Sequence, residues 1–194
     1  MGYIYFTRHG QSLWNIEKRI CGATDVALSD LGREQATALG SQIRQKLDAG
    51  EREENGELFR IDEILYSPLS RTTETAQLIA AQTGIPSRPE MRIIEQDFGR
   101  YEGLDRELEE FSRDKMRFFY DFDGGETMAR CMARVYNLME ELEKESRETG
   151  KIYLLVAHNG IARGFESWFR EMTIQEYANG CRFGNCELIR REFE

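Results

Sequence analysis

Long apolar stretches are missing from this sequence. No hydrophobic run approaches the roughly 20 residues that a helix needs to cross a bilayer, so we expect no membrane-spanning helix and no membrane partner. Met1 is followed almost at once by a strand-like segment, without the basic region and apolar core of a signal peptide. We therefore expect a cytoplasmic protein. Internal repeats and low-complexity tracts are also absent.

Cysteine pairs and a positive charge balance are also lacking. The four cysteines, Cys21, Cys131, Cys181 and Cys186, include no Cys-x-x-Cys pair. In a reducing compartment we expect free thiols, although spacing leaves open a pairing of Cys181 with Cys186. The formal net charge is −9. A nucleic-acid partner is not expected, because proteins that bind nucleic acid carry a basic face, and any anion site here needs local positive charge.

The residues that are present indicate an ordinary globular chain. Hydrophobic residues make up 40% and charged residues 31%, and 194 residues suggest one domain spanning residues 1–194. Three continuous apolar runs predict buried parallel strands at Tyr3–Thr7, Ile61–Tyr66 and Ile152–Ala157. Met91–Glu95 and Glu187–Arg191 are further strand candidates.

Helical patterns lie between these strands. Apolar residues recur at helical spacing over residues 31–47, after Ser29 as a possible cap. Ser67-Pro68 predicts another helix start, with serine as the cap and proline in the first helical position. Further helices are expected over Glu126–Arg147 and from about Gly160. The alternation predicts an α/β sandwich with a mainly parallel sheet, interrupted at about residues 100–124 by an inserted lid.

The three predicted strands all end in residues that suit an anion. The first ends at Arg8-His9-Gly10, the second is followed by Arg71 in the first turn of a helix, and the third is followed by His158. These are the only two histidines of the chain. Ligands of open α/β sheets bind beyond the carboxyl ends of the strands, where helix N-termini also favour phosphate. We expect these side chains to converge there.

Three segments that carry these residues resemble the signatures of a known family. "TRHGQSLWN", "SPLSRTTETA" and "LLVAHNGIAR" are similar to signature segments of the histidine phosphatase superfamily, also called the phosphoglycerate mutase-like family. "RIIEQDFGRYEGLD" is similar to the acidic segment of that family, and "GGET" to a further helix start. The matches lie in order along nearly the whole chain. The resemblance implies a three-layer α/β/α sandwich of the phosphoglycerate mutase-like kind, with a short lid.

The resemblance also implies roles for the clustered residues. His9 would attack phosphorus and form a phosphohistidine, and neutral imidazole is available near neutral pH. Arg8 and Arg71 can hold phosphate oxygens through bidentate bonds, and His158, if protonated, would share that charge. Asn15 is similar to a family asparagine that reaches the same phosphate, although a helix-start cap is its alternative role.

The expected proton donor to the leaving group is Glu95. Burial and a nearby phosphate dianion would favour its protonated form, and the same carboxylate could later activate water. Asp97 and Glu102 lie in the same acidic stretch, and without the family pattern the sequence does not choose among the three. No metal or other cofactor is expected, because two arginines beside the histidines would repel a cation.

Three functions are compatible with these residues: a phosphatase acting on small phosphomonoesters, a phosphoglycerate mutase, and a non-catalytic module that binds phosphorylated ligands. The catalytic residue types argue against the third. Family mutases carry a longer segment with paired arginines, whereas Leu104–Asp123 is only twenty residues long and has no Arg-Arg pair. Its charges sum to a nearly neutral field, and its aromatic stretch, Lys115–Phe122, suits an apolar-walled entrance or simple packing. Phosphatase is therefore favoured, with the physiological substrate and the oligomeric state unassigned.

Overall fold

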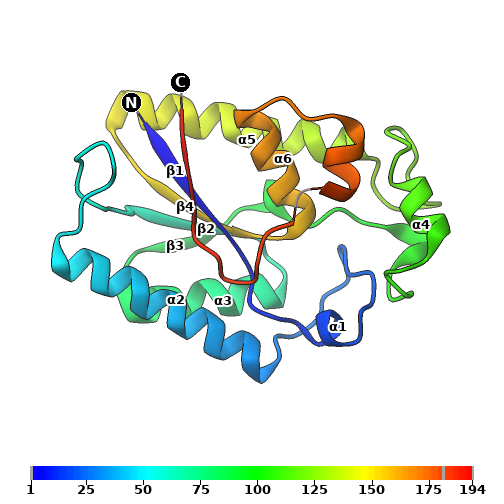
Figure 1. Cartoon of the computed structure of the whole chain (residues 1–194), viewed down its shortest axis with the longest axis horizontal. Helices are drawn as coiled ribbons and strands as arrows, with labels where there is room; N and C mark the ends of the chain where they lie inside the picture. The colour runs from blue at the N-terminus through cyan, green and yellow to red at the C-terminus, as the bar shows by residue number, and fades with distance from the viewer. Residues whose placement is uncertain (1, 181, 194) are drawn as a thin grey trace.

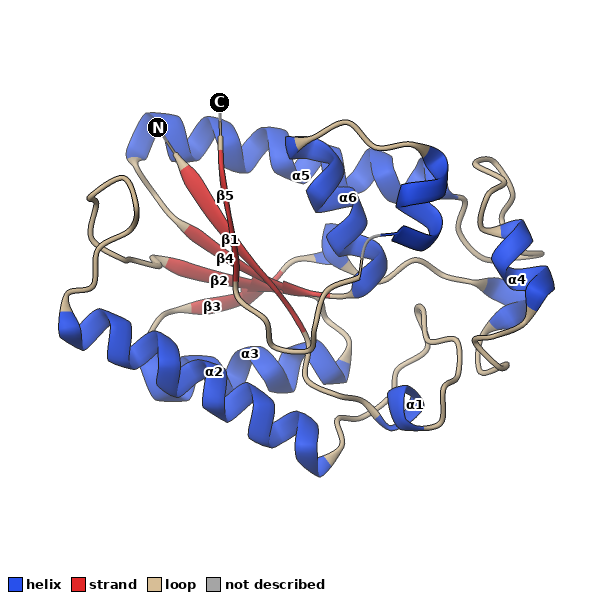
Figure 2. Cartoon of the chain, in the orientation of Figure 1, coloured by secondary structure: helices blue, strands red, loops and turns tan. Residues whose placement is uncertain are grey.

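The computed structural model describes residues 2–180 and 182–193. Its centre is a five-stranded sheet in the order β3-β2-β4-β1-β5 (Figure 2). The strands are β1 (Tyr3–Arg8), β2 (Glu63–Tyr66), β3 (Ser87–Pro89), β4 (Tyr153–Ala157) and β5 (Ile189–Glu192). The first four are parallel and β5 runs antiparallel beside β1. The expected mainly parallel sheet is confirmed.

Helices cover both faces of the sheet and complete three layers (Figure 1). One face carries α2 (Asp30–Ala49) and α3 (Ser70–Thr83), and the other carries α5 (Met128–Thr149) and α6 (Asn159–Phe169). Successive residues of β1 point to opposite faces, so Ile4 and Phe6 pack into one core while Tyr3 and Tyr5 pack into the other. A strand buried on both faces explains why β1 is continuously apolar.

The helix ends agree only in part with the sequence expectations. Ser29 caps α2 as expected, its hydroxyl accepting from the N–H of Gly32, and α5 begins after Thr127. Ser67 does not cap a helix, because α3 begins three residues later, after Leu69, without a side-chain cap. The Ser67 hydroxyl instead contacts the ring of His158. Ser67, the polar residue after β2, therefore contacts His158 rather than capping α3.

One strand expectation is wrong. Met91–Ile93 forms a 3₁₀ turn, η1, rather than part of a strand, because the Glu90 side chain accepts from the N–H of Arg92 and starts the turn. The strand that pairs with β2 is instead the short β3, which lies before this turn. The turn redirects the chain, so Glu95 leaves the sheet edge instead of extending it.

The insert at about residues 100–124 packs as a small aromatic unit at the end of the molecule beyond the strands (Figure 1). It contains the turn η2 (Gly99–Tyr101) and the short helix α4 (Glu109–Asp114). Phe98, Tyr101, Phe111 and Phe122 pack together there with Ile20. The buried Asp114 carboxylate accepts from the Tyr101 hydroxyl at 2.8 Å, so a charged hydrogen bond also holds the insert together.

Two further expectations concern membranes and thiols. No helix in residues 2–180 and 182–193 has the length and apolar character needed to cross a membrane. Cys21, Cys131 and Cys186 are free thiols. The possible pairing of Cys181 with Cys186 lies outside the described residues, because Cys181 is not described.

Candidate active site

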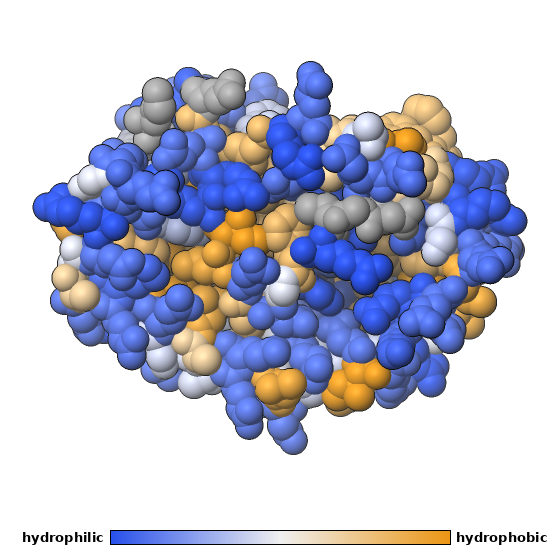
Figure 3. Space-filling model, in the orientation of Figure 1, coloured by the Kyte–Doolittle hydropathy of each residue, from blue (hydrophilic) through white to orange (hydrophobic). Residues whose placement is uncertain are grey.

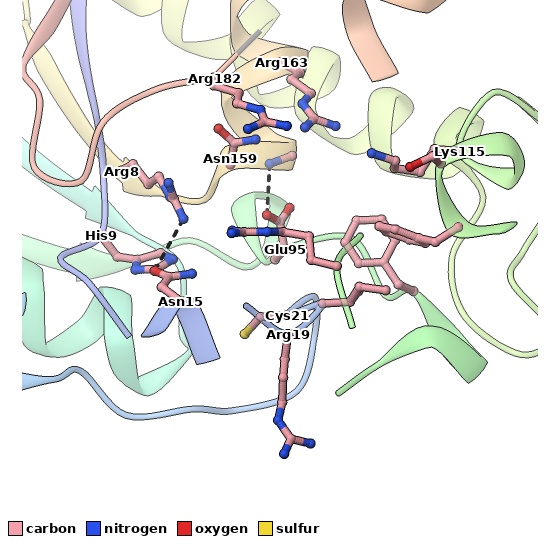
Figure 4. Close-up of a pocket in the computed structure, with 16 residues that line it drawn as sticks. Arg8, His9, Asn15, Arg19, Cys21, Glu95, Lys115, Asn159, Arg163 and Arg182 are labelled. Atoms are coloured by element: carbon pink, nitrogen blue, oxygen red, sulfur yellow. Dashed lines mark hydrogen bonds between the residues drawn. The ribbon is translucent and has the colours of Figure 1, made fainter. Parts of the chain in front are cut away.

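The carboxyl ends of the parallel strands β1 and β4 open on one pocket of about 200 Å³ (Figure 4). Arg8, His9, Asn15 and Glu95 line this pocket. Arg71 and His158 lie just behind the lining and are almost fully buried. Residues far apart in the sequence are thus brought together, as the strand order requires.

His9 is held in one orientation by its own neighbour. Its Nδ1 lies 2.6 Å from the carbonyl oxygen of Gly10, so Nδ1 carries the proton and donates, which leaves a lone pair on Nε2. Burial and the charges of Arg8 and Arg71 hold the pKa of His9 well below its ordinary value. The neutral, nucleophilic form of the ring is therefore favoured.

Gly10 has its own reason to follow this histidine. A Cβ at Gly10 would overlap the backbone of Gly32 at the start of α2. The Gly10 N–H also donates to the Thr75 hydroxyl at 3.1 Å, which ties the end of β1 to α3. The tripeptide Arg8-His9-Gly10 thus combines a cation, a neutral imidazole and a tight backbone packing position.

His158 faces His9 with ring centroids 5.3 Å apart. Its Nε2 lies 2.7 Å from the Ser67 hydroxyl, and its buried Nδ1 has no hydrogen-bond partner in the described part of the chain. Burial, Arg71 and His9 hold the pKa of His158 well below its ordinary value. A bound phosphate dianion would favour protonation of this ring, because an opposite charge stabilises the imidazolium.

The two arginines are positioned by backbone carbonyls. Arg71 donates to the oxygens of Gly22 and Thr24 at 2.7 and 2.9 Å, and Arg8 donates to that of Phe183 at 3.2 Å. Burial lowers the pKa of the Arg8 guanidinium to about 10, and nearby Arg106 and Arg71 add to this effect. The Nε atoms of Arg8 and Arg71 are buried and have no partner among the described residues. Buried donors of this kind normally find an acceptor, and phosphate oxygens would provide one.

Asn15 takes the cap role and also contacts Arg8. Its side-chain oxygen accepts from the N–H of Ser12 at 3.1 Å and completes a capping box at the start of α1 (Leu13–Ile16). The same oxygen accepts from Arg8 Nη2 at 3.4 Å. Asn15 also lines the pocket, so its amide lies where it can reach a phosphate held by Arg8.

Glu95 is buried at the N-terminus of α6. One carboxylate oxygen accepts from the Gly160 N–H at 2.9 Å and the other accepts from the N–H of Gln96 at 3.0 Å. A Cβ at Gly160 would overlap the Glu95 carboxylate, so glycine permits this approach. Of the three acids in this stretch, Glu95 alone lines the pocket.

The other two acids have structural contacts instead. Asp97 accepts from the N–H of Gly99 at 2.8 Å within its own turn. Glu102 accepts from the N–H groups of Gly22 and Phe98, both at 3.0 Å, and so braces the loop whose carbonyls hold Arg71. The structure thus separates three carboxylates that the sequence alone left equivalent.

The sequence analysis missed a set of cations around the pocket, which we call the cationic wall: Arg106, Lys115, Arg163 and Arg182. The near-neutral field expected for the insert is a sum over charges that the structure separates, because Arg106 and Lys115 line the pocket and no acid of the insert does. Glu107 pairs with Lys18, Glu110 with Arg100, and Asp114 with Arg113. Summed charge gave no signal of this separation. The only sequence signal for the cationic wall was Arg163, which follows His158 by five residues and so lies in the first turns of the next helix.

The aromatic entrance is built from other residues than expected. Phe118 and Phe119 are exposed and Phe122 is buried in the insert core, and none of the three lines the pocket. Phe98 and Phe111 line it instead, together with Ile20. Phe122 therefore follows the packing alternative, whereas the exposed Phe118 and Phe119 follow neither alternative. Groups of three or more His, Cys, Asp or Glu able to hold a metal ion are not found in the described part of the chain.

The sequence and the site geometry now lead to a family. A sequence model described as the histidine phosphatase superfamily (branch 1) matches residues 4–194. This chain belongs to the histidine phosphatase superfamily. The expected resemblance and fold are thereby confirmed.

Relatives of this histidine phosphatase domain include both phosphatases and mutases. Phosphoserine phosphatase 1 of Hydrogenobacter thermophilus is 30% identical over 162 residues, covering 80% of this chain and 70% of that protein. A probable phosphoglycerate mutase, GpmB, of Salmonella choleraesuis is 32% identical over 171 residues, covering 83% and 71%. The structure of a mycobacterial glucosyl-3-phosphoglycerate phosphatase with VO3 superposes with a TM-score of 0.79 at 24% identity, covering 98% and 90% of the two chains, and shows a shared fold. Enzymatic phosphoryl transfer and phosphatase activity in general are therefore supported.

Proposed function

We propose that this protein is a metal-independent phosphatase that hydrolyses small phosphomonoesters through a phosphohistidine on His9. The single observation that carries the proposal is the oriented His9 ring, whose Nδ1–H is engaged by Gly10 while burial and two arginines keep it neutral. Nε2 attacks phosphorus, a P–N bond forms, and the bond from phosphorus to the ester oxygen breaks. Arg8, Arg71 and His158 stabilise the charge on the phosphoryl oxygens.

Glu95 completes the two steps as acid and then base. In the first step its protonated carboxyl gives a proton to the leaving alkoxide. In the second step its carboxylate takes a proton from water as the water oxygen attacks phosphorus and the P–N bond breaks. Inorganic phosphate is released, and His9 returns to its neutral form.

Metal independence follows from the charge of the pocket. Arg8, Arg19 and the four residues of the cationic wall line it, whereas Glu95 is its one carboxylate in the described part of the chain. A divalent cation would be repelled by these cations, and the single carboxylate does not offset them. The cations themselves supply the neutralising charge that a metal provides in other phosphoryl-transfer enzymes.

Trapping the intermediate tests the proposal. Rapid quenching during turnover of ³²P-labelled p-nitrophenyl phosphate should capture an adduct that is stable in base and labile in acid. We expect His9→Ala to abolish both adduct and turnover. An adduct mapped to His158, or turnover without any adduct, would contradict the assignment. A second arm with EDTA should leave turnover intact, and loss of activity that zinc or magnesium restores would refute metal independence.

A mutase is a second candidate, favoured by the cationic wall, which could hold the carboxylate of a phosphorylated acid. The relatives named as mutases support it too. A mutase must keep water away from the phosphohistidine until a substrate hydroxyl accepts the phosphoryl group. Incubating the enzyme with 3-phosphoglycerate and a trace of 2,3-bisphosphoglycerate compares the two routes. We expect free phosphate to form faster than 2-phosphoglycerate, and the reverse order would establish the mutase.

A further inference from the structure

The hydroxyl of Ser67 contacts the ring of His158 inside the protein. Ser67 follows β2 and His158 follows β4, and these two strands are paired in the sheet. The Ser67 oxygen lies 2.7 Å from His158 Nε2, and the two residues are only 0% and 1% exposed. Bulk water does not reach either side chain, so the protein itself determines where their protons lie.

The backbone holds Ser67 against this ring. The Ser67 N–H donates to the carbonyl of Val156 at 3.1 Å, and the Ser67 carbonyl accepts from the Thr72 hydroxyl at 2.9 Å. Neither contact uses the Ser67 side chain. Within the described residues, His158 Nε2 is the polar contact of the Ser67 hydroxyl. The hydroxyl is therefore placed by a frame that does not depend on it.

The hydrogen-bonding capacity of this pair favours one tautomer of the neutral ring. If Nε2 carried the proton, Nε2 would donate to Ser67, and both the serine proton and the Nδ1 lone pair would be buried without a partner. If Nδ1 carries the proton, the hydroxyl donates to Nε2, and the Nδ1–H is the group left without a partner among the described residues. Buried polar groups without partners cost free energy, so the Nδ1–H tautomer is favoured.

The Nδ1–H is also the ring donor that a ligand can use. Nε2 is occupied by Ser67, and the ring lies beside His9, with the two ring centroids 5.3 Å apart. An oxygen of the phosphoryl group that His9 attacks would supply the missing acceptor. The imidazolium carries the same Nδ1–H, so His158 presents this donor in both protonation states as long as its neutral form is the Nδ1–H tautomer.

We propose that Ser67 is a positioning residue, which donates to His158 Nε2 and thereby keeps a proton on Nδ1 for the phosphoryl oxygen. Ser67 acts through His158 and does not touch the substrate. When the substrate dianion brings a second proton to the ring, the hydroxyl rotates and its oxygen accepts from the new Nε2–H. This inference rests on the proposed phosphatase function, and it means that His158 can donate to phosphate without first being protonated.

Charged and titratable groups from several elements lie around His158 and affect its protonation. They are His9 and Arg8 at the end of β1, Arg71 of α3, Arg134 of α5, and the Glu95 carboxylate at the start of α6. Burial and the cations favour the neutral ring. The choice of tautomer therefore matters most at neutral and higher pH, where the imidazolium is least populated.

The ¹⁵N chemical shifts of the imidazole report the tautomer directly, because protonated and unprotonated ring nitrogens give distinct signals. In the ¹⁵N-histidine-labelled protein at about pH 8, we expect His158 to have a protonated Nδ1 and an unprotonated Nε2. Ser67→Ala should populate the Nε2–H form. The matched control is Thr72→Val, which removes a buried hydroxyl that braces the Ser67 backbone and should keep the wild-type signals. An Nε2–H ring in the wild type, or unchanged signals in Ser67→Ala, would overturn the proposal.

Turnover of p-nitrophenyl phosphate connects the tautomer to catalysis, because this leaving group needs little protonation. At about pH 8, Ser67→Ala should lower kcat about tenfold. The deficit relative to the wild type should shrink at about pH 5.5, where a protonated ring in the substrate complex regains Nδ1–H without Ser67. Ser67→Cys, which keeps a weak donor of similar size, should recover part of the activity.

A structural role alone would give a different pattern. Ser67→Ala would then behave like Thr72→Val, with equal deficits at both pH values and no recovery in Ser67→Cys, and this result would overturn the proposal. A wild-type protein that shows the expected tautomer but hydrolyses no p-nitrophenyl phosphate would instead refute the phosphatase function itself.

Discussion

Both histidines of this chain are buried among arginines, and the protonation of each ring decides what it can do. His9 needs a free lone pair on Nε2 in order to attack phosphorus, whereas His158 gains a role in charge stabilisation once it is protonated. In the structure, burial and the neighbouring cations lower the pKa of both rings. We infer that the site holds two neutral imidazoles before substrate arrives, and that the substrate dianion then favours protonation of His158.

The first prediction concerns the titration of these two rings. Only two histidines are present, so an NMR titration of the untagged protein should give two pairs of ring signals, with His9→Ala assigning them. We expect both folded rings to stay neutral as the pH falls from 8 to below 6.5, while the urea-unfolded chain titrates near about 6.5. Below that pH the unfolded chain binds more protons, so the free energy of unfolding should decrease as the pH falls. Rings that titrate at or above the unfolded value would contradict the inference.

Among the structural elements, the loop that follows β1 and α1 depends on one carboxylate. Glu102, at the end of η2, accepts from the N–H groups of Gly22 and Ala23 at 3.0 and 3.2 Å. The carbonyl of Gly22 in turn holds Arg71. The insert therefore positions Arg71, which we propose binds phosphate, through the loop, although Glu102 itself does not line the pocket.

The second prediction follows from this chain of contacts. Glu102→Gln should destabilise the fold by about 2 to 3 kcal/mol, because charge-assisted bonds to backbone N–H groups are weakened. It should also lower kcat roughly tenfold to a hundredfold through a displaced Arg71, to the same extent for p-nitrophenyl phosphate and for alkyl phosphates. Thermal unfolding and steady-state kinetics measure the two effects.

Glu95→Gln is the comparison that separates positioning from proton donation. This variant should slow alkyl phosphates about a hundredfold or more and p-nitrophenyl phosphate much less, because that leaving group needs little protonation. Glu107→Gln is the control, since Glu107 is exposed and its distance to Lys18 is 3.9 Å. If Glu102→Gln showed the leaving-group dependence and Glu95→Gln did not, the two roles would be reversed.

The elements also show what sequence reasoning can reach. Strand ends were predictable because the central residues of β1, β2 and β4 are buried on both faces and therefore apolar. The turn at Met91–Ile93 was not predictable. It depends on one hydrogen bond that the Glu90 side chain accepts, and the local sequence pattern does not indicate this bond. Arg106 and Lys115 were missed because the summed charge of the insert does not show which side chains face the pocket. Only the packing of the insert places its acids outside the pocket lining.

At the scale of the whole molecule, an acidic protein concentrates positive charge at one site. The net charge is −9, and the face seen in Figure 3 is mostly hydrophilic. Yet among the described residues the pocket is lined by one carboxylate, Glu95, and by six cationic side chains, which are Arg8, Arg19 and the four of the cationic wall. Arg8 is only partly satisfied, since its Nε has no partner among the described residues. Buried charges that await a ligand reduce the stability of the free protein.

The third prediction is that anions stabilise the whole fold through this site. Inorganic phosphate at about 100 times its Kd should add about 2.7 kcal/mol, which corresponds to a rise in Tm of roughly 5 to 10 °C for a chain of this size. Sodium chloride at equal ionic strength should produce little of this rise, because screening does not replace bidentate contacts. Arg8→Met should abolish the rise from phosphate, while its Tm without phosphate should match or exceed that of the wild type. The loss of bonds to Phe183 and Asn15 is offset in that variant by removing a buried charge. Scanning calorimetry of both proteins in both salts measures these shifts, and an equal response to phosphate and chloride would show that the buried cations do not bind the anion.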